Sequence, residues 1–252
     1  MITAVLKHAW DLYRTHFGTV AAVVMVIWLP LELLSSYMDY FVFDSDDFRR
    51  SFKFAQFLDN FFGIIATAGV ISIGYTSWLG RRPSVREALD VGVRSWGRMW
   101  WTRFLTALTL VFGFLLLIFP GIYLLVRLAL VEPIAVCERV SGSAAMRRSF
   151  ELTRGHFWQV FLLGLVFLGL ILAAIALVVV PVMFIPALDH WLIDAAMSLV
   201  TDVIAAFATL CALSAYVWFA GQKNMAEGAG PMSSPSTPPG SSAVTEEPPL
   251  VN

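Results

Sequence analysis

Long runs without charge dominate this chain, and short polar stretches separate them. Between Phe157 and Leu188 there is not one Asp, Glu, Lys or Arg, and a run of about 18 or more such residues is typical of a membrane-spanning helix. Five further segments have room for a helix of that kind. The pattern predicts an all-α polytopic membrane protein with six transmembrane helices in three hairpins. The predicted spans cover about residues 17–37, 55–79, 100–119, 122–137, 157–185 and 193–220.

The division between the third and fourth spans has an alternative, because residues 104–126 form one uncharged run. A single helix there gives five spans and moves the arginines that follow Glu138 to the outer face. Basic residues concentrate in cytoplasmic segments, so charge placement favours six spans, both termini in the cytoplasm and a location in the inner membrane. Pro120-Gly121 also has the composition of a tight turn between two helices.

A short motif recurs ahead of two apolar runs, as DLYRTHF at residues 11–17 and as ELTRGHF at residues 151–157. Around the second copy, Met146, Phe150 and Phe157 fall on one stripe of a helix. The first copy has an equivalent stripe, and a charged stripe lies beside each. The pattern predicts cytoplasmic amphipathic helices that lie at the membrane interface, with a looser third unit before the third span.

These amphipathic helices place basic and imidazole side chains where lipid headgroups lie. An arginine near an anionic membrane surface contributes about 1 kcal/mol, and amphipathic rings favour the interface. We therefore expect headgroup contacts from six residues; the alternative is anchoring at the interface without headgroup specificity. The six residues are Arg14, His16, Arg147, Arg148, Arg154 and His156.

Charged residues inside the predicted spans are the default candidates for a functional site. Arg127 and Glu132 fall in the fourth span, and Glu32 falls near the outer end of the first. Arg127 and Glu132 lie about 140° apart on one helix, so we expect Arg127 to pair with Glu32 across helices. The three residues form a predicted polar site, opened where Pro133 frees a backbone carbonyl. The alternative is a purely structural charge pair, and Asp202 is predicted near the outer interface without a role.

Composition supports the membrane assignment. Of the 252 residues, 58% are hydrophobic and 14% are charged, whereas roughly a quarter are charged in soluble domains. The two cysteines, Cys137 and Cys211, lie in apolar segments without metal-ligand spacing. The sequence shows no familiar catalytic motif, so we expect no catalytic residue, no metal and no cofactor. Residues 1–224 are predicted to form the membrane domain, and the Pro/Ser/Gly-rich segment 225–252 a disordered cytoplasmic tail.

The stretch FPGIYLLVRLALVEPIAVCERVSGSAAMRRSFELTRGHFWQVF, residues 119–161, carries a family resemblance. It combines a Pro-Gly-Ile-Tyr segment, an arginine in the following span, a proline near the end of that span and an Arg-Arg-Ser-Phe-Glu-Leu-Thr-Arg-Gly segment. It resembles a bacterial and archaeal family of multi-pass membrane proteins related to the membrane domain of glycerophosphoryl diester phosphodiesterases. In the multidomain relatives a separate soluble barrel performs hydrolysis. The resemblance therefore implies a membrane module without the catalytic part.

We expect a non-enzymatic membrane protein that interacts with lipid, or with a membrane partner, through its basic cytoplasmic helices. The expected partners are the bilayer with its anionic headgroups and a membrane protein or a second copy, with no nucleic acid. One alternative is a transporter of a small molecule or ion that uses the region of Arg127. A second is a module accessory to a phospholipid-hydrolysing enzyme. An intramembrane enzyme acting on lipid requires Glu132 or Glu32 to face a cavity.

Overall fold

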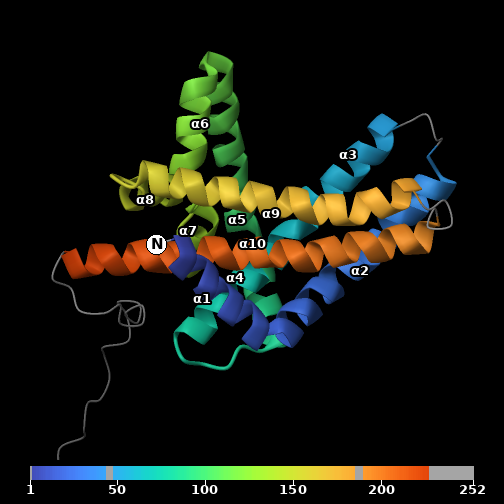
Figure 1. Cartoon of the computed structure of the whole chain (residues 1–252), viewed down its shortest axis with the longest axis horizontal. Coiled ribbons are helices and arrows are strands. Elements are labelled where there is room, and N and C mark those ends of the chain that lie inside the picture. The colour runs from blue at the N-terminus through green and yellow to red at the C-terminus, as the bar shows by residue number, and fades with distance from the viewer. Residues whose placement is uncertain (1, 44–47, 185–189, 227–252) are drawn as a thin grey trace, which may run out of the picture.

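The computed structural model describes residues 2–43, 48–184 and 190–226, and these residues form helices and the turns between them (Figure 1). The predicted tail, 225–252, lies outside the described residues except at its first two positions, which continue the last helix. Residues 185–189, where the fifth span is predicted to end and the following loop to begin, also lie outside them.

Five helical segments of the described chain are long and apolar enough to cross a membrane, and a bent pair of helices is a sixth candidate. The pair, α8 and α9, bends by 109°. The all-α class with five to six candidate spans is confirmed, while the arrangement in three hairpins stays a prediction. The segments are α2 (Phe17–Phe41), the stack of α3 (Phe48–Leu58), η1 (Asp59–Gly63) and α4 (Ile64–Trp78), α5 (Val85–Leu116), α6 (Ile118–Arg127) with α7 (Val131–Cys137), α8 (Ser143–Leu152) with α9 (Phe157–Phe184), and α10 (Trp191–Ala226).

The predicted amphipathic unit before the third span and that span form one continuous helix, α5. The Ser84 side chain accepts a hydrogen bond from the backbone N–H of Glu87 at 3.2 Å, and this spacing is that of a capping box. Ala88 and Gly92 are buried against α4, and a Cβ added to Gly92 would lie 2.6 Å from the carbonyl oxygen of Ile65. Small residues thus let the backbones of α4 and α5 approach closely.

The turn predicted at Pro120-Gly121 is wrong, because the chain breaks earlier. Leu117 is extended, with φ −170° and ψ 156°, and Pro120 lies in the first turn of α6. Proline is tolerated there because the first N–H groups of a helix have no intrahelical partner. Gly121 serves close packing instead, since an added Cβ would lie 2.4 Å from the ring of Phe114.

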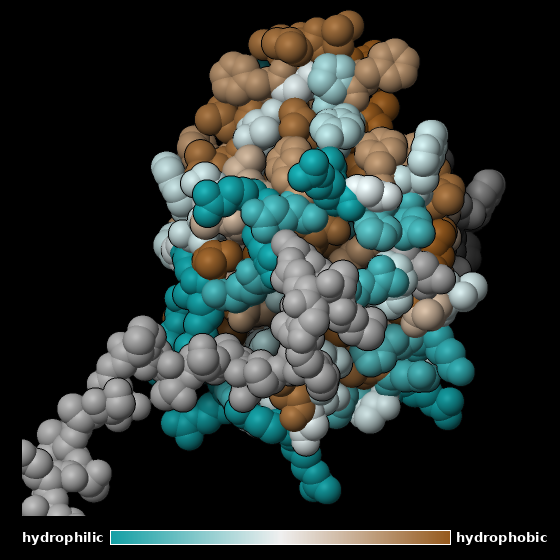
Figure 2. Space-filling model, turned by 90° about the vertical axis from the view of Figure 1, so that its left-hand side faces the viewer, coloured by the Kyte–Doolittle hydropathy of each residue, from teal (hydrophilic) through white to brown (hydrophobic). Residues whose placement is uncertain are grey.

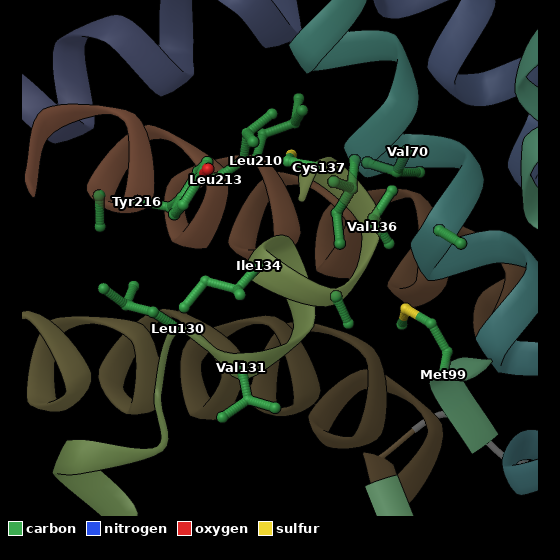
Figure 3. Packing of buried hydrophobic residues seen from close by; sticks show 14 of the residues in the cluster. Val70, Met99, Leu130, Val131, Ile134, Val136, Cys137, Leu210, Leu213 and Tyr216 are labelled. Atoms are coloured by element: carbon green, nitrogen blue, oxygen red, sulfur yellow. The ribbon is translucent and has the colours of Figure 1, made fainter. Parts of the chain in front are cut away.

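The predicted fourth span lies within one candidate span, Ile118–Cys137, but its helix is interrupted between α6 and α7. Pro133 lies in the first turn of α7, and its ring and missing N–H prevent α6 from continuing through this point. Every residue of α7 except Glu132 is buried. Figure 3 shows Ile134 of α7 among the buried side chains that include Leu210 of α10 and Val70 of α4.

Helices are present where the repeated motif predicted them, as α1 (Ile2–Thr15) and α8. α1 packs against α10 through a buried stripe that includes Val5 and Leu12, and the Tyr13 hydroxyl donates to the carbonyl of Val203 at 3.0 Å. Burial raises the pKa of Tyr13, so this hydroxyl stays a donor. The neighbouring aromatic residue Trp10 is exposed. The location of both helices at a membrane interface stays a prediction.

Helices α5 and α6 project from the rest of the molecule, crosswise to α9 and α10 (Figure 1). Residues 111–119, which we call the apolar arm, contain no polar side chain. The hydrophobic surface of this arm forms one end of the molecule in Figure 2. A surface of this kind indicates contact with hydrocarbon or with another apolar surface. The most exposed residues of the arm, between 64% and 84%, are Leu115, Leu116, Leu117, Ile118 and Phe119.

Candidate functional site

An ion pair between two helices marks the candidate site. Nε of Arg103 on α5 donates to Oε1 of Glu132 on α7 at 2.7 Å, and Nη2 of Arg103 donates to Oγ1 of Thr67 on α4 at 3.1 Å. The side chain of Arg103 is still 27% exposed and that of Glu132 41%. The pair is therefore accessible rather than sealed in the core.

The ion pair lies in the wall of a cavity of about 820 Å³, which we call the apolar cavity, between η1, α5, α7 and α10. Binding sites for small molecules have volumes of roughly 300–1,000 Å³ and mostly apolar walls. Trp100, Phe104 and Leu125 line this cavity and are also exposed on the outside of the molecule. Arg103 is the only Lys or Arg among the described lining residues. The wall of the cavity is thus mostly apolar, and its charged groups are the Arg103–Glu132 pair and the carboxyl group of Asp59.

Glu132 reaches this cavity because α6 and α7 are separate helices. It lies in the first turn of α7, between the buried residues Val131 and Pro133. An acidic side chain is favourable in a first helical turn, where the backbone N–H groups carry partial positive charge. The proline that breaks the span therefore also creates the helix start that carries the carboxylate.

Asp59 belongs to the walls of both the apolar cavity and a second cavity. It begins η1, a single turn of π-helix between α3 and α4, and such turns frequently occur at functional sites. Asp59 lines both cavities. The second, which we call the acidic cavity, has about 360 Å³ and lies between α2, α3 and α10. Its carboxyl groups belong to Glu32, Asp39, Asp59, Asp194 and Asp202.

The acidic cavity has more acceptors than donors. The Ser36 hydroxyl lies 3.2 Å from Oδ2 of Asp194, and the carboxyl groups of Glu32 and Asp202 line the same cavity. Oδ2 of Asp202 is buried, and no donor among the described residues reaches it. No Lys or Arg occurs among the described residues that line this cavity.

Arg127, the predicted centre of the polar site, lies elsewhere. Its Nε donates to the Tyr123 hydroxyl at 3.0 Å, and its Nη1 donates to the carbonyl of Phe150 at 3.2 Å and to Oγ1 of Thr153 at 3.3 Å. The rings of Tyr123 and Phe150 lie 5.3 and 5.8 Å from the guanidinium carbon. Arg127 thus ties α6 to α8, and the structure does not bring it to Glu32.

The predicted polar site is therefore divided. Glu132 lines the apolar cavity with Arg103, while Glu32 lines the acidic cavity, and Asp59 lines both. Arg127 lines neither cavity among those described. The backbone carbonyl that Pro133 frees by lacking an N–H belongs to Ala129, which also lines the apolar cavity.

Both histidines predicted to contact headgroups are engaged within the molecule. Nε2 of His16 lies 2.7 Å from Oγ of Ser77, which joins the start of α2 to the end of α4. The ring of His156 packs against that of Phe219 on α10, with 5.3 Å between the centroids. Each histidine therefore fixes the angle at which a long helix leaves the short helix before it.

The four arginines predicted to contact headgroups divide into two groups. Nε of Arg148 donates to Oε1 of Glu138 at 3.2 Å, and its Nη1 lies 3.4 Å from Oε2 of Glu151. This arginine holds α8 to the end of α7. The other three are exposed and stay candidates for headgroup contact: Arg14, Arg147 and Arg154.

The sequence patterns missed Arg103, Asp59 and Asp194, and they assigned Asp202 no role. Arg103 follows the Trp100-Trp101 pair. Because tryptophan is enriched at membrane interfaces, the sequence placed Arg103 among the charges that flank a span rather than at a site within it. Asp59 had a usable signal, because it is the only charged residue of the predicted span 55–79. The acidic residues of α10 meet Glu32 only through the packing of α10 against α2.

Residues 98–222 match the family model of the membrane domain of glycerophosphoryl diester phosphodiesterase. With the five to six candidate spans, this match defines the class: the chain is a multi-pass membrane protein. More particularly, it carries over residues 98–222 the membrane domain of the glycerophosphoryl diester phosphodiesterase family, which confirms the resemblance seen in residues 119–161. The matched region contains Arg103 and Glu132 and begins after Asp59. No curated protein and no solved structure was found to match the chain.

Proposed function

We propose that this protein binds a membrane lipid in the apolar cavity and does not catalyse a reaction on it. The observation that carries the proposal is the combination of a cavity of about 820 Å³, apolar over most of its wall, with one accessible ion pair, Arg103–Glu132. An amphiphile needs both features. Its acyl chain replaces water against the apolar wall, at about 25 cal/mol per Å² of apolar surface buried, and its polar headgroup meets the charges.

The rim of the apolar cavity favours an occupant that comes from the bilayer. Trp100, Phe104 and Leu125 are 42%, 47% and 50% exposed, and all three are apolar. Such a rim lies in hydrocarbon when the surrounding helices cross a membrane. A lipid enters sideways past these side chains without first passing through water, whereas a polar solute meets no polar entrance at this rim.

The basic residues of α1 and α8 support the same function from outside the cavity. Arg14, Arg147 and Arg154 are exposed, and three arginines at an anionic surface contribute about 1 kcal/mol each. In this proposal both helices lie on the cytoplasmic face of the inner membrane with both chain termini. They hold the bundle at a fixed depth, so that the rim of the cavity lies at the level of the acyl chains.

A cavity-filling variant tests the lipid proposal. Ala107 lines the apolar cavity, and its neighbour Leu108 is exposed on α5 and lies outside the cavity lining. The expected result is that Ala107→Trp lowers several-fold the amount of phospholipid that stays with the purified protein, measured by mass spectrometry of the intact complex. The matched control Leu108→Trp leaves that amount unchanged. Equal lipid retention by the wild type and both variants contradicts the proposal.

A second candidate function is the transport of a small molecule or ion, and one observation favours it. Asp59 lines both the acidic and the apolar cavity, so a polar route that joins the two would run past Asp59 rather than past Arg127. Transport predicts cation uptake into proteoliposomes that Asp59→Asn abolishes, with Asp90→Asn, at an exposed ion pair on α5, as the control.

A role beside a phospholipid-hydrolysing enzyme is the third candidate, and it rests on the family. The matched model describes the membrane domain of glycerophosphoryl diester phosphodiesterase. A lipid-holding module fits such a role, because it can present a headgroup to a separate catalytic domain. Faster phosphodiesterase turnover in membranes that contain this protein, compared with membranes that contain Ala107→Trp, is the expected result.

A further inference from the structure

We infer that the turn between α7 and α8, together with the side of α5 that it covers, forms a binding site for the phosphate group of a lipid headgroup or of the free ion. The site is separate from the apolar cavity, since neither Arg98 nor Arg139 lines that cavity. Three features carry the inference: donors of Arg98 that no described residue uses, the backbone conformation of Arg139, and the positive start of α8.

The turn after α7 lies directly on α5. The backbone N–H of Gly142 donates to Oγ1 of Thr102 at 2.8 Å, and that hydroxyl donates to the carbonyl of Arg98 at 2.7 Å. A Cβ added to Gly142 would lie 3.1 Å from the ring of Trp101. The turn therefore stays close to the part of α5 that carries Arg98. The positive charges of Arg98 and Arg139 are near enough to act on each other.

Arg98 has hydrogen-bond donors that the protein does not use. Its Nη2 donates to Oγ of the buried Ser95 at 3.0 Å, whereas its Nε is buried and no acceptor among the described residues reaches it. None of the ion pairs between described residues includes Arg98. A buried donor without a partner lowers stability, and the planar fork of a guanidinium matches the oxygens of a phosphate. A phosphate beside Arg98 would supply the acceptors that are missing.

Arg139 holds a backbone conformation that glycine adopts with less strain. Its φ is +55°, the only positive φ of a non-glycine residue in the described part of the chain. It follows Glu138, the C-cap of α7, and the usual residue at this position is glycine. Strained residues of this kind cluster at functional sites. The fold therefore does not require an arginine here, and the side chain needs another reason for its presence.

The side chain of Arg139 is available to a ligand. It is exposed, and no ion pair between described residues includes it. The neighbouring carboxylate of Glu138 is engaged elsewhere, because its Oε1 lies 3.2 Å from Nε of Arg148 and accepts from the Tyr216 hydroxyl at 3.1 Å. The charge of Arg139 is therefore free to meet an anion.

The start of α8 adds partial positive charge at the same turn. Its N-cap is Gly142, which has no side chain to accept a hydrogen bond, and its first turn contains no acidic residue. The first N–H groups of a helix carry partial positive charge and attract anions. Positive groups thus reach this place from α5, from the turn and from α8.

The position of the site along α5 favours a lipid as the source of the phosphate. Trp101 lies three residues after Arg98 and is 48% exposed, and tryptophan is enriched at membrane–water interfaces. The third span is predicted to begin at about residue 100. In that topology Arg98 lies at the level of the headgroups, where every phospholipid carries its phosphate.

Calorimetric titration of the full-length protein in detergent tests the site. The titrants are dihexanoyl phosphatidate, dihexanoyl phosphatidylcholine and inorganic phosphate, which compare an anionic lipid, a lipid without net charge and the free ion. The expected result is that phosphatidate binds more tightly than either of the others. The same result is expected in Ala107→Trp, because that variant fills the apolar cavity and leaves the phosphate site intact.

Two variants remove the proposed contacts one at a time. Arg98→Gln and Arg139→Gly should each weaken phosphatidate binding about ten-fold, which corresponds to the loss of a hydrogen bond to a charged group. The control Arg94→Gln, at an exposed ion pair on the same helix, should leave it unchanged. Arg139→Gly also relieves the strained φ, so its midpoint of thermal unfolding should equal or exceed that of the wild type.

Each outcome decides for or against the site. Tighter binding of phosphatidate than of inorganic phosphate assigns the lipid as the ligand, and equal binding of the two assigns the free ion; both bear out the site. Binding that is unchanged in Arg98→Gln and Arg139→Gly, or lost equally in Arg94→Gln, overturns it. Equal affinity for phosphatidylcholine also overturns it. A lower unfolding midpoint of Arg139→Gly shows that the arginine serves the fold, and overturns it as well.

Discussion

Arg103 and Arg127 lie on adjacent helices, and their surroundings give them opposite roles. Arg127 on α6 is surrounded by partners from α6 and α8: the Tyr123 hydroxyl, the Phe150 carbonyl and the Thr153 hydroxyl. Arg103 on α5 bonds to Glu132 in the wall of a cavity that remains accessible. The sequence pattern alone made Arg127 a candidate for a functional site, with a structural charge pair as the alternative. The comparison teaches that a charge within a span indicates a site only when its partners leave room for a ligand.

The largest expected effect is on stability, from Arg127→Met. The substitution removes three charge-assisted hydrogen bonds and leaves the Phe150 carbonyl without its donor. Hydrogen bonds to charged groups contribute roughly 1.5–3 kcal/mol each, not fully additively, so we expect a loss of about 3 kcal/mol. The measurement is the midpoint of thermal unfolding in detergent, with Arg147→Met on the exposed face of α8 as the control. An unchanged midpoint contradicts the assigned role.

The next effect comes from Arg103→Met, which should lower the stability less than Arg127→Met does but should lower lipid retention more. Both partners of the ion pair are partly exposed, so we expect a loss of about 1–2 kcal/mol in unfolding free energy, part of which Glu132→Gln restores in the double variant. Lipid retention falls in the single and the double variant alike, whereas folded Arg127→Met retains lipid normally. The comparison breaks down if Arg127→Met loses lipid and Arg103→Met does not.

The smallest effects come from the two threonines that bond to these arginines. Thr153 is buried and also donates to the carbonyl of Ser149 at 2.8 Å, so Thr153→Val should cost about 1 kcal/mol. Thr67→Val should cost less, because Arg103 keeps its bond to Glu132. Thr67→Val should lower lipid retention about two-fold, while Thr153→Val leaves it unchanged. Identical effects of both variants on both measurements would show that the two arginines do not differ in role.

The sequence predicted the helices better than their partners. The starts of α2 and α9 at Phe17 and Phe157 follow from the repeated motif and the charge-free runs, and the structure has both helices. Periodicity and charge spacing describe one helix at a time, and the separation of Arg127 from Glu132 was worked out for a single helix, whereas the two residues lie on α6 and α7. These patterns carry no information on which helices touch, and the pairing of Arg103 with Glu132 depends on the crossing of α5 and α7.

The helix boundaries that the sequence predicted wrongly have a related cause. The Trp100-Trp101 pair suggested a helix boundary, yet Ala88 and Gly92 hold the first half of α5 against α4, and the helix continues unbroken to Leu116. Conversely, the apolar run up to Cys137 suggested one unbroken helix; Ile118–Cys137 remains one candidate span, but α6 and α7 are separate helices within it, and Pro133 lies in the first turn of α7. Hydropathy cannot register either effect, because a close backbone contact and a missing N–H group leave the apolar content unchanged.

The apolar arm has a consequence for how the chain is inserted during synthesis. Exposing its apex residues to water forfeits roughly 1.5–3 kcal/mol for each large side chain, so the apex at Leu117 remains in hydrocarbon once it has arrived there. The nearest charges along the chain are Arg103, in the middle of α5, and Arg127, at the end of α6. No charged side chain between them therefore has to be carried into the bilayer when α5 and α6 enter.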